Sequence, residues 1–170
     1  MAIHGSPSRS ASGGDPVADK PIKHPFLSGK YEGPWYADAA GFVFFSPRGK
    51  MLILKRAGQS DWAGRWASAG GMMEEGETPL HAAVRESIEE LGALPRFCKL
   101  MGKPHKMYWR GILYCTWVVY TPIEFRPKKL NTKEHSQWRW VTAEELGEGY
   151  LLHDGFRDTL EEIAPHMLDK

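Results

Sequence analysis

The chain has 170 residues, of which 42% are hydrophobic and 25% are charged, and this composition is typical of one globular domain with a single core. The formal net charge of +1 gives no general attraction to long nucleic acids or to an acidic membrane, so any recognition of phosphate has to be local. A membrane span needs about 18 consecutive apolar residues, and no such stretch occurs.

The N-terminal segment differs in composition from the rest of the chain. It is rich in glycine, serine and proline, with too little apolar surface to offset the entropy of ordering, so we expect a flexible tail over residues 1–25 and one domain over 26–170. The tail lacks the apolar run of a secretory signal. Cys98 and Cys115 lack the CxxC spacing of a metal or redox site, which favours reduced core residues and a cytoplasmic location.

The first half of the domain predicts a hairpin, a short strand and a helix. Two apolar runs, Ala39 to Ser46 and Met51 to Lys55, flank Pro47 to Lys50, whose proline and glycine are typical of a turn. Trp66 to Ala69 predicts a short strand. The following helix is expected to begin at a threonine cap and a first-turn proline and to bury apolar residues at helical spacing: Thr78, Pro79, Leu80, Val84, Ile88 and Leu91.

The second half predicts three strands and two helices. Ile112 to Tyr120 is apolar on both faces, which indicates a central strand. The other expected elements are the strands Phe97 to Met101 and Trp138 to Val141, a helix over Ala143 to Leu146 capped by Thr142, and a helix from Phe156 to Ala164 that ends near Pro165.

The segment from Gly71 to Ala93 carries the clearest chemical signal. Glu86, Glu89 and Glu90 are spaced i, i+3, i+4, so on a helix their carboxylates share one side and repel one another. Such a group is either a solvated helix face or a set of hard oxygen ligands for Mg²⁺ or Mn²⁺. The spacing alone favours the solvated face, whereas the adjoining glycines and the amphipathic helix favour the cation.

This segment resembles the Nudix box, G-x5-E-x7-R-E-U-x-E-E-x-G-U, where U is a bulky aliphatic residue. Ser87 and Ala93 are smaller than the two U positions ask. The resemblance extends from about Tyr36 to the C-terminus and implies an α+β fold, a mixed β-sheet between helices, and hydrolysis of a nucleoside diphosphate linked to another moiety. The matching positions are Gly71, Glu77, Arg85, Glu86, Glu89, Glu90 and Gly92.

The resemblance also implies roles for individual residues. Mg²⁺ or Mn²⁺ would be held by Glu86, Glu89, Glu90 and a backbone carbonyl in the preceding glycine pair, for which Gly70 is the candidate. Glu89 and Glu90 are thereby also catalytic candidates, together with Arg85 and Glu134. Glu77 and Arg85 would pair and brace the loop against the helix. Glu134 lies where many family members place a glutamate that reaches toward the metal, and it is the first candidate for the base; a box glutamate is the alternative.

The identity of the substrate stays open at this level. We expect a nucleotide and slightly favour a nucleoside triphosphate, with ADP-ribose, a dinucleoside polyphosphate or a nucleotide sugar as alternatives. A binding module without activity and an isomerase on the same fold are less favoured, because no box glutamate is missing and neither cysteine is well placed for catalysis. Both a monomer and a homodimer are compatible with the sequence. Candidate substrate contacts are Arg56, Trp66, Tyr108 and His135.

Overall fold

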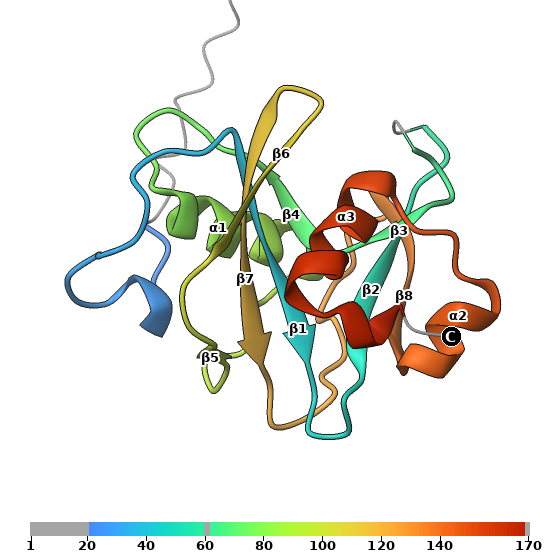
Figure 1. Cartoon of the computed structure of the whole chain (residues 1–170). Helices are drawn as coiled ribbons and strands as arrows, with labels where there is room; N and C mark the ends of the chain where they lie inside the picture. The colour runs from blue at the N-terminus through green and yellow to red at the C-terminus, as the bar shows by residue number, and fades with distance from the viewer. Residues whose placement is uncertain (1–20, 60–61, 169–170) are drawn as a thin grey trace, which may run out of the picture.

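A computed structural model describes residues 21–59 and 62–168. Within these residues a mixed sheet of eight strands lies between helices, as Figure 1 shows. The strands are β1 (Ala39–Phe45), β2 (Met51–Arg56), β3 (Trp66–Ala67), β4 (Ala69–Met72), β5 (Lys99–Leu100), β6 (His105–Trp109), β7 (Ile112–Tyr120) and β8 (His135–Val141). The helices are η1 (Pro25–Leu27), α1 (Pro79–Leu91), α2 (Ala143–Gly149), α3 (Asp154–Ile163) and η2 (Pro165–Met167).

Strand β1 is central in the sheet and pairs with three other strands. It runs parallel to β7 and antiparallel to β2 and β4. Gly41 of β1 faces Gly70 of β4, and a Cβ on Gly41 would lie 2.3 Å from the carbonyl oxygen of Ala69. The paired glycines therefore allow β4 to approach β1 closely, and this approach places Gly71, the first residue of the box, beside α1.

The two faces of the sheet carry separate cores. Successive side chains of a strand point to opposite faces, so Phe42 and Phe44 join the core beneath α1, whereas Val43 joins the core beneath α2 and α3. The predicted α+β sandwich is confirmed, and the predicted central strand Ile112–Tyr120 is observed with the same bounds.

Helix α1 forms for the predicted reasons. The Thr78 side chain accepts a hydrogen bond from the His81 backbone N–H at 3.2 Å, and Pro79 occupies the first turn. Gly92 ends the helix at φ +80°, a left-handed conformation suited to glycine. The predicted apolar stripe packs inward, with Leu80, Val84 and Leu91 buried and Ile88 partly buried against the same core.

Several predicted bounds were wrong. The predicted strand Trp66–Ala69 is two strands, β3 and β4, because β3 pairs with β2 and β4 with β1. Only Lys99–Leu100 of the predicted strand Phe97–Met101 forms a ladder, which pairs with β7. Strand β6 was not predicted. Its side chains alternate only between partly buried and exposed, so none of them is a core position. Strand β8 begins three residues earlier than predicted, at His135, and this extension brings His135 into the site.

Most of the predicted tail, residues 1–20, lies outside the described residues. In the part from 21 to 25, Ile22 packs against the core, and His24 is buried with its Nε2 3.1 Å from the carbonyl oxygen of Pro95. These residues are packed against the domain. No helix in the described ranges is long and apolar enough to cross a membrane.

Candidate active site

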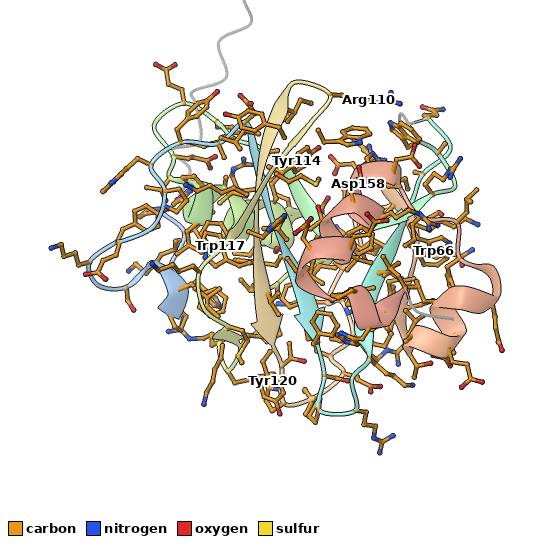
Figure 2. The ribbon with its side chains drawn as sticks, viewed as in Figure 1. Trp66, Arg110, Tyr114, Trp117, Tyr120 and Asp158 are labelled. Atoms are coloured by element: carbon orange, nitrogen blue, oxygen red, sulfur yellow. The ribbon has the colours of Figure 1, made fainter. Side chains whose placement is uncertain are left out.

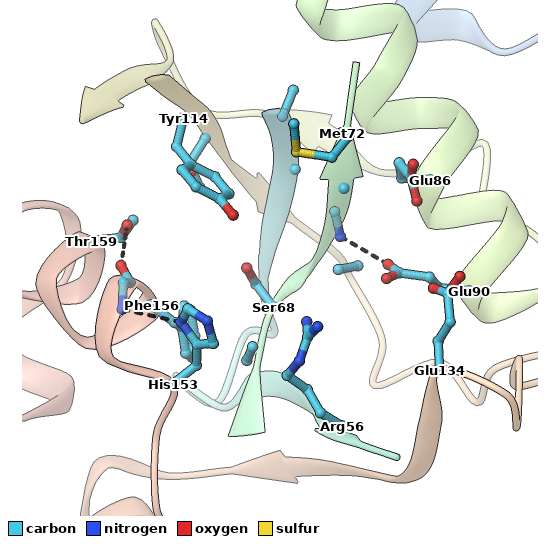
Figure 3. Close-up of a pocket in the computed structure, with 18 of the residues that line it drawn as sticks. Arg56, Ser68, Met72, Glu86, Glu90, Tyr114, Glu134, His153, Phe156 and Thr159 are labelled. Carbon is cyan, nitrogen blue, oxygen red and sulfur yellow. Dashed lines mark hydrogen bonds between the residues drawn. The ribbon is translucent and has the colours of Figure 1, made fainter. Parts of the chain in front are cut away.

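A cavity of about 590 Å³ opens between the sheet, α1 and the segment that leads into α3. Figure 3 shows three of its carboxylates, Glu86, Glu90 and Glu134, on one side and His153 on the other. Arg56 extends into the space between them. The cavity is thus lined by carboxylates at one end and by an imidazole at the other, with a guanidinium between them.

Glu90 is the most firmly held of the carboxylates. It is 3% exposed, and its Oε2 accepts a hydrogen bond from the Gly70 backbone N–H at 2.8 Å. Its Oε1 lies 2.8 Å from Nε2 of the buried His135. Burial raises the pKa of Glu90, although the hydrogen bonds from His135 and Gly70 favour the carboxylate. Strand β4 and strand β8 thus fix both oxygens of one glutamate.

Glu86 lies one turn earlier on α1, with its carboxylate against Gly71. A Cβ at Gly71 would lie 2.5 Å from Glu86 Cδ, so the glycine leaves the space that this carboxylate occupies. Burial, reinforced by the neighbouring charge of Glu90, raises the pKa of Glu86 to about 7 in spite of a hydrogen bond from Arg85. The positive charge near Glu86 and Glu90 is therefore too small to keep the pKa values of both carboxyls at their ordinary level.

The donor set fits a divalent cation. Ligand atoms of Glu90, Glu134 and His135 all lie within 4.8 Å of one another, and Glu86 faces the same end of the cavity. Buried carboxylates that repel each other gain most from a cation, which removes the repulsion and restores their ordinary pKa. Nδ1 of His135 is buried without a hydrogen-bond partner, while its Nε2 is committed to Glu90.

Arg85 braces this arrangement. Its Nε and Nη2 donate to the two oxygens of Glu77 at 2.5 and 3.1 Å, and Nη2 also donates to the Met72 carbonyl oxygen at 3.0 Å. Nη1 reaches Glu86 at 2.8 Å. Burial opposes ionisation of Glu77, but the hydrogen bonds from Arg85 and the Glu74 backbone outweigh it and lower the pKa of Glu77. The guanidinium therefore joins the loop after β4 to α1, the contact that the family resemblance implied.

Not every predicted residue reaches the cavity. Glu89 does not line it; its side chain is 52% exposed and lies 3.2 Å from Arg85 Nη1, because β4 approaches α1 on the side of Glu86 and Glu90. Trp66 is buried in the core beneath α3, where its ring contacts Tyr150, and Tyr108 is 76% exposed on β6 outside the cavity. His135 was expected to contact phosphate, but its 2% exposed ring is directed at Glu90.

A NUDIX domain model matches residues 35–166. The chain belongs to the Nudix family. A Mycobacterium tuberculosis protein named "Putative 8-oxo-dGTP diphosphatase 3" is 30% identical over 125 residues, which cover 69% of this chain and 57% of that protein. The CTP pyrophosphohydrolase of Escherichia coli is 52% identical over 44 residues, covering 26% of this chain and 33% of that protein. This chain therefore spans about half or less of these two relatives.

Solved structures show the same Nudix fold. The MutT protein from Methanosarcina mazei Go1 superposes with a TM-score of 0.59 at 23% identity, over 82% of this chain and the whole of that one. At this identity the likeness establishes the fold alone.

The Nudix box thus accounts for one wall of the cavity only. Three polar residues that sequence reasoning did not single out, Ser68, Tyr114 and His153, line the other walls. Tyr114 sits in an apolar strand, and His153 precedes a helix as an isolated histidine, so neither position carried a motif. Their roles depend on neighbours that are distant in sequence.

Proposed function

We propose that this chain is a divalent-cation-dependent hydrolase that cleaves a pyrophosphate bond in a nucleoside diphosphate linked to another moiety, with nucleoside triphosphates favoured as substrates. The observation that carries the proposal is the convergence of Glu86, Glu90 and Glu134 at one end of an open cavity that also contains Arg56. Membership of the Nudix family supports the reaction class. The names of the two curated relatives, which refer to 8-oxo-dGTP and CTP, support the choice of triphosphate.

Different residues of the cavity have different proposed roles. Glu86 and Glu90 would hold Mg²⁺ or Mn²⁺, which supplies charge neutralisation to the diphosphate and acidifies water at the site. Gly70 holds Glu90 in place through its N–H. Arg56 lines the cavity between its two ends, where a guanidinium binds phosphate oxygens well.

Glu134 is the proposed general base. Its side chain is exposed at the mouth of the cavity, in contrast to the buried Glu90. An exposed carboxylate keeps the freedom to take a proton from water and release it to solvent, whereas Glu90 is fixed through both oxygens. Arg85 does not line the cavity, so we assign it to bracing Glu77 and Glu86 rather than to contact with substrate.

A panel of substrates tests the proposal. The purified protein would be incubated with Mg²⁺ and nucleoside triphosphates, ADP-ribose, nucleotide sugars or dinucleoside polyphosphates, and the products separated by chromatography. Formation of a nucleoside monophosphate and pyrophosphate from a triphosphate is expected, and it also locates the cleaved bond. Turnover of ADP-ribose or a nucleotide sugar alone would replace the triphosphate assignment. Turnover of no compound, with nucleotide binding retained, would indicate a binding module.

A further inference from the structure

An aromatic clamp, which we define as Trp62, Trp109 and His153, lies beside the end of the cavity opposite the carboxylates. The His153 ring centroid lies 4.9 Å from each tryptophan ring, and the two tryptophans are 5.7 Å apart. The three residues come from the β2–β3 loop, the end of β6 and the residue before α3. Of the three, His153 lines the cavity.

The backbone N–H of Gly155 fixes which ring nitrogen of His153 carries a proton. Its Nδ1 accepts a hydrogen bond from the Gly155 backbone N–H at 3.1 Å, as Figure 3 shows. A neutral imidazole whose Nδ1 accepts has its proton on Nε2, which makes Nε2–H a donor. Burial, and next the charge of Arg56, lower the pKa of His153, so the neutral form is favoured at neutral pH. The proton of the ring is therefore on Nε2, and His153 lines the cavity.

Guanidinium groups surround the clamp. Cζ of Arg110 lies 5.0 Å from the Trp62 ring and 4.9 Å from the Trp109 ring. Cζ of Arg65 lies 5.8 Å from the Trp62 ring centroid, and Nη1 of Arg65 donates to the Leu152 carbonyl oxygen at 3.3 Å. Arg56, Arg65 and Arg110 all act electrostatically on His153, with Asp154 as the opposing charge. Arg56, Arg65 and Arg110 give positive potential around His153, and three carboxylates line the opposite end of the cavity. This arrangement suits an extended anion that a cation holds at the acidic end.

Two backbone conformations support a role beyond folding. Among the described residues, Trp62 at φ +64° and Arg110 at φ +49° are the non-glycine residues with positive φ. Arg110 and Gly111 form the two-residue turn between β6 and β7, where asparagine followed by glycine is the favoured pair. Arginine in this position is unfavourable for the backbone, and its side chain covers both tryptophans. Figure 2 shows Arg110 at the tip of this hairpin.

We propose that the aromatic clamp and its arginines form a subsite for a phosphate group beyond the scissile anhydride, with His153 Nε2–H as the direct donor and Arg56, Arg65 and Arg110 as the source of positive potential. The subsite selects nucleoside triphosphates or longer polyphosphates over nucleotide sugars and ADP-ribose, which carry no further phosphate in that chain. The proposal rests on the proposed function for the position of the scissile bond.

Two substitutions at His153 distinguish the two roles of its ring, which are donation of a hydrogen bond from Nε2 to the ligand and capping of α3 through Nδ1. Asparagine places an oxygen near the position of Nδ1, so His153→Asn keeps the cap on Gly155 and removes the Nε2 donor. Glutamine places its amide nearer the position of Nε2, so His153→Gln keeps a donor and loses the cap. The probe is inorganic tripolyphosphate, with pyrophosphate and guanosine for comparison, measured by calorimetry on the whole protein in Mg²⁺ at low salt.

The subsite predicts that tripolyphosphate binds more tightly than pyrophosphate and that His153→Asn weakens its binding about tenfold or more, whereas His153→Gln stays within about threefold of the parent. Parental binding by His153→Asn would overturn the proposal. Loss in His153→Gln alone would also overturn it, since the role would then be capping. Binding of guanosine that falls in step with tripolyphosphate would assign the clamp to the base instead.

The variant Arg110→Asn provides an independent test of the phosphate subsite. Asparagine tolerates positive φ, so this variant should unfold at the same or higher urea concentration while binding tripolyphosphate several-fold more weakly. Arg48→Asn is the matched control, because Arg48 is an exposed arginine before a glycine in the β1–β2 turn at the opposite end of the sheet (Figure 1). Equal binding by both variants would overturn the proposal.

The same measurements separate this proposal from the proposed function. Tripolyphosphate binding that follows the predicted pattern in a protein that hydrolyses no nucleotide would support the subsite and contradict the hydrolase. Hydrolysis of triphosphates together with parental binding in His153→Asn and Arg110→Asn would support the hydrolase and overturn the subsite.

Discussion

Gly71 is the position where one added carbon atom tests the geometry of the carboxylate cluster. A Cβ there would lie 2.5 Å from Cδ of Glu86 and 2.6 Å from both of its carboxylate oxygens. These separations are about 1 Å shorter than an optimal carbon contact of about 3.5 Å. Because the obstructing atoms are the far end of a flexible side chain, Gly71→Ala should displace the Glu86 carboxylate and leave the fold intact.

Displacing one ligand from a cation site should weaken cation binding by about 10- to 100-fold, which is about 1.4–2.7 kcal/mol. Binding of Mn²⁺ to the cation-free protein, followed by electron paramagnetic resonance, measures this directly, and urea unfolding checks stability. Gly147→Ala is the control, because a Cβ on Gly147 of α2 would meet no atom within 4 Å. Parental Mn²⁺ affinity in folded Gly71→Ala would refute the reasoning.

A double variant tests the cause. If Gly71→Ala acts through Glu86, it should add little to the effect of Glu86→Gln on Mn²⁺ affinity. Full additivity of the two effects would show that the alanine disturbs another part of the site.

The folded-state pKa of Glu86, about 7, exceeds its ordinary 4.5, so its carboxyl costs the cation-free protein stability as pH rises from 4.5 to about 7. Urea unfolding across this range should show Glu86→Gln gaining stability relative to the parent up to about pH 7 and levelling off above it; a constant difference would contradict the shift. Arg85→Met leaves the buried Glu77 without its partner and should lower the free energy of unfolding by about 3–5 kcal/mol, whereas a loss under about 1 kcal/mol would argue against the brace. Glu134→Gln should lower kcat by about 10²- to 10⁴-fold with little change in Mn²⁺ affinity, and a parallel fall in affinity would make Glu134 a ligand rather than the base.

The box helix was predictable because its signals are local. Thr78, Pro79 and Gly92 specify where α1 begins and ends through caps that involve only neighbouring residues. The pairing of Glu77 with Arg85 followed from the family resemblance, and the structure places the two side chains together.

The division of labour among the glutamates was not predictable. Helical spacing placed Glu86, Glu89 and Glu90 on one side, but which of them faces the cavity depends on the approach of β4, and this is set by the long-range pairing of Gly41 with Gly70. The extra length of β8, which brings His135 to Glu90, is likewise fixed by pairing with β2. Such contacts leave no periodic signal in the sequence.

The aromatic residues were the weakest part of the prediction for a related reason. A tryptophan suits a core and a ligand site equally well by composition. Trp66 proved to be a core residue, whereas Trp62 and Trp109 meet over His153 from segments far apart in the chain.

The central claim is that the carboxylate end of the cavity binds the cation required for hydrolysis, with Glu90 as its most rigid member. The most direct measurement compares the parent with Glu90→Gln for release of pyrophosphate from nucleoside triphosphates in Mg²⁺, with Mn²⁺ binding measured on the same samples. The account predicts turnover in the parent, a loss of at least about 100-fold in the variant, and a parallel loss of Mn²⁺ affinity. A Glu90→Gln protein that keeps activity within about tenfold of the parent would contradict it.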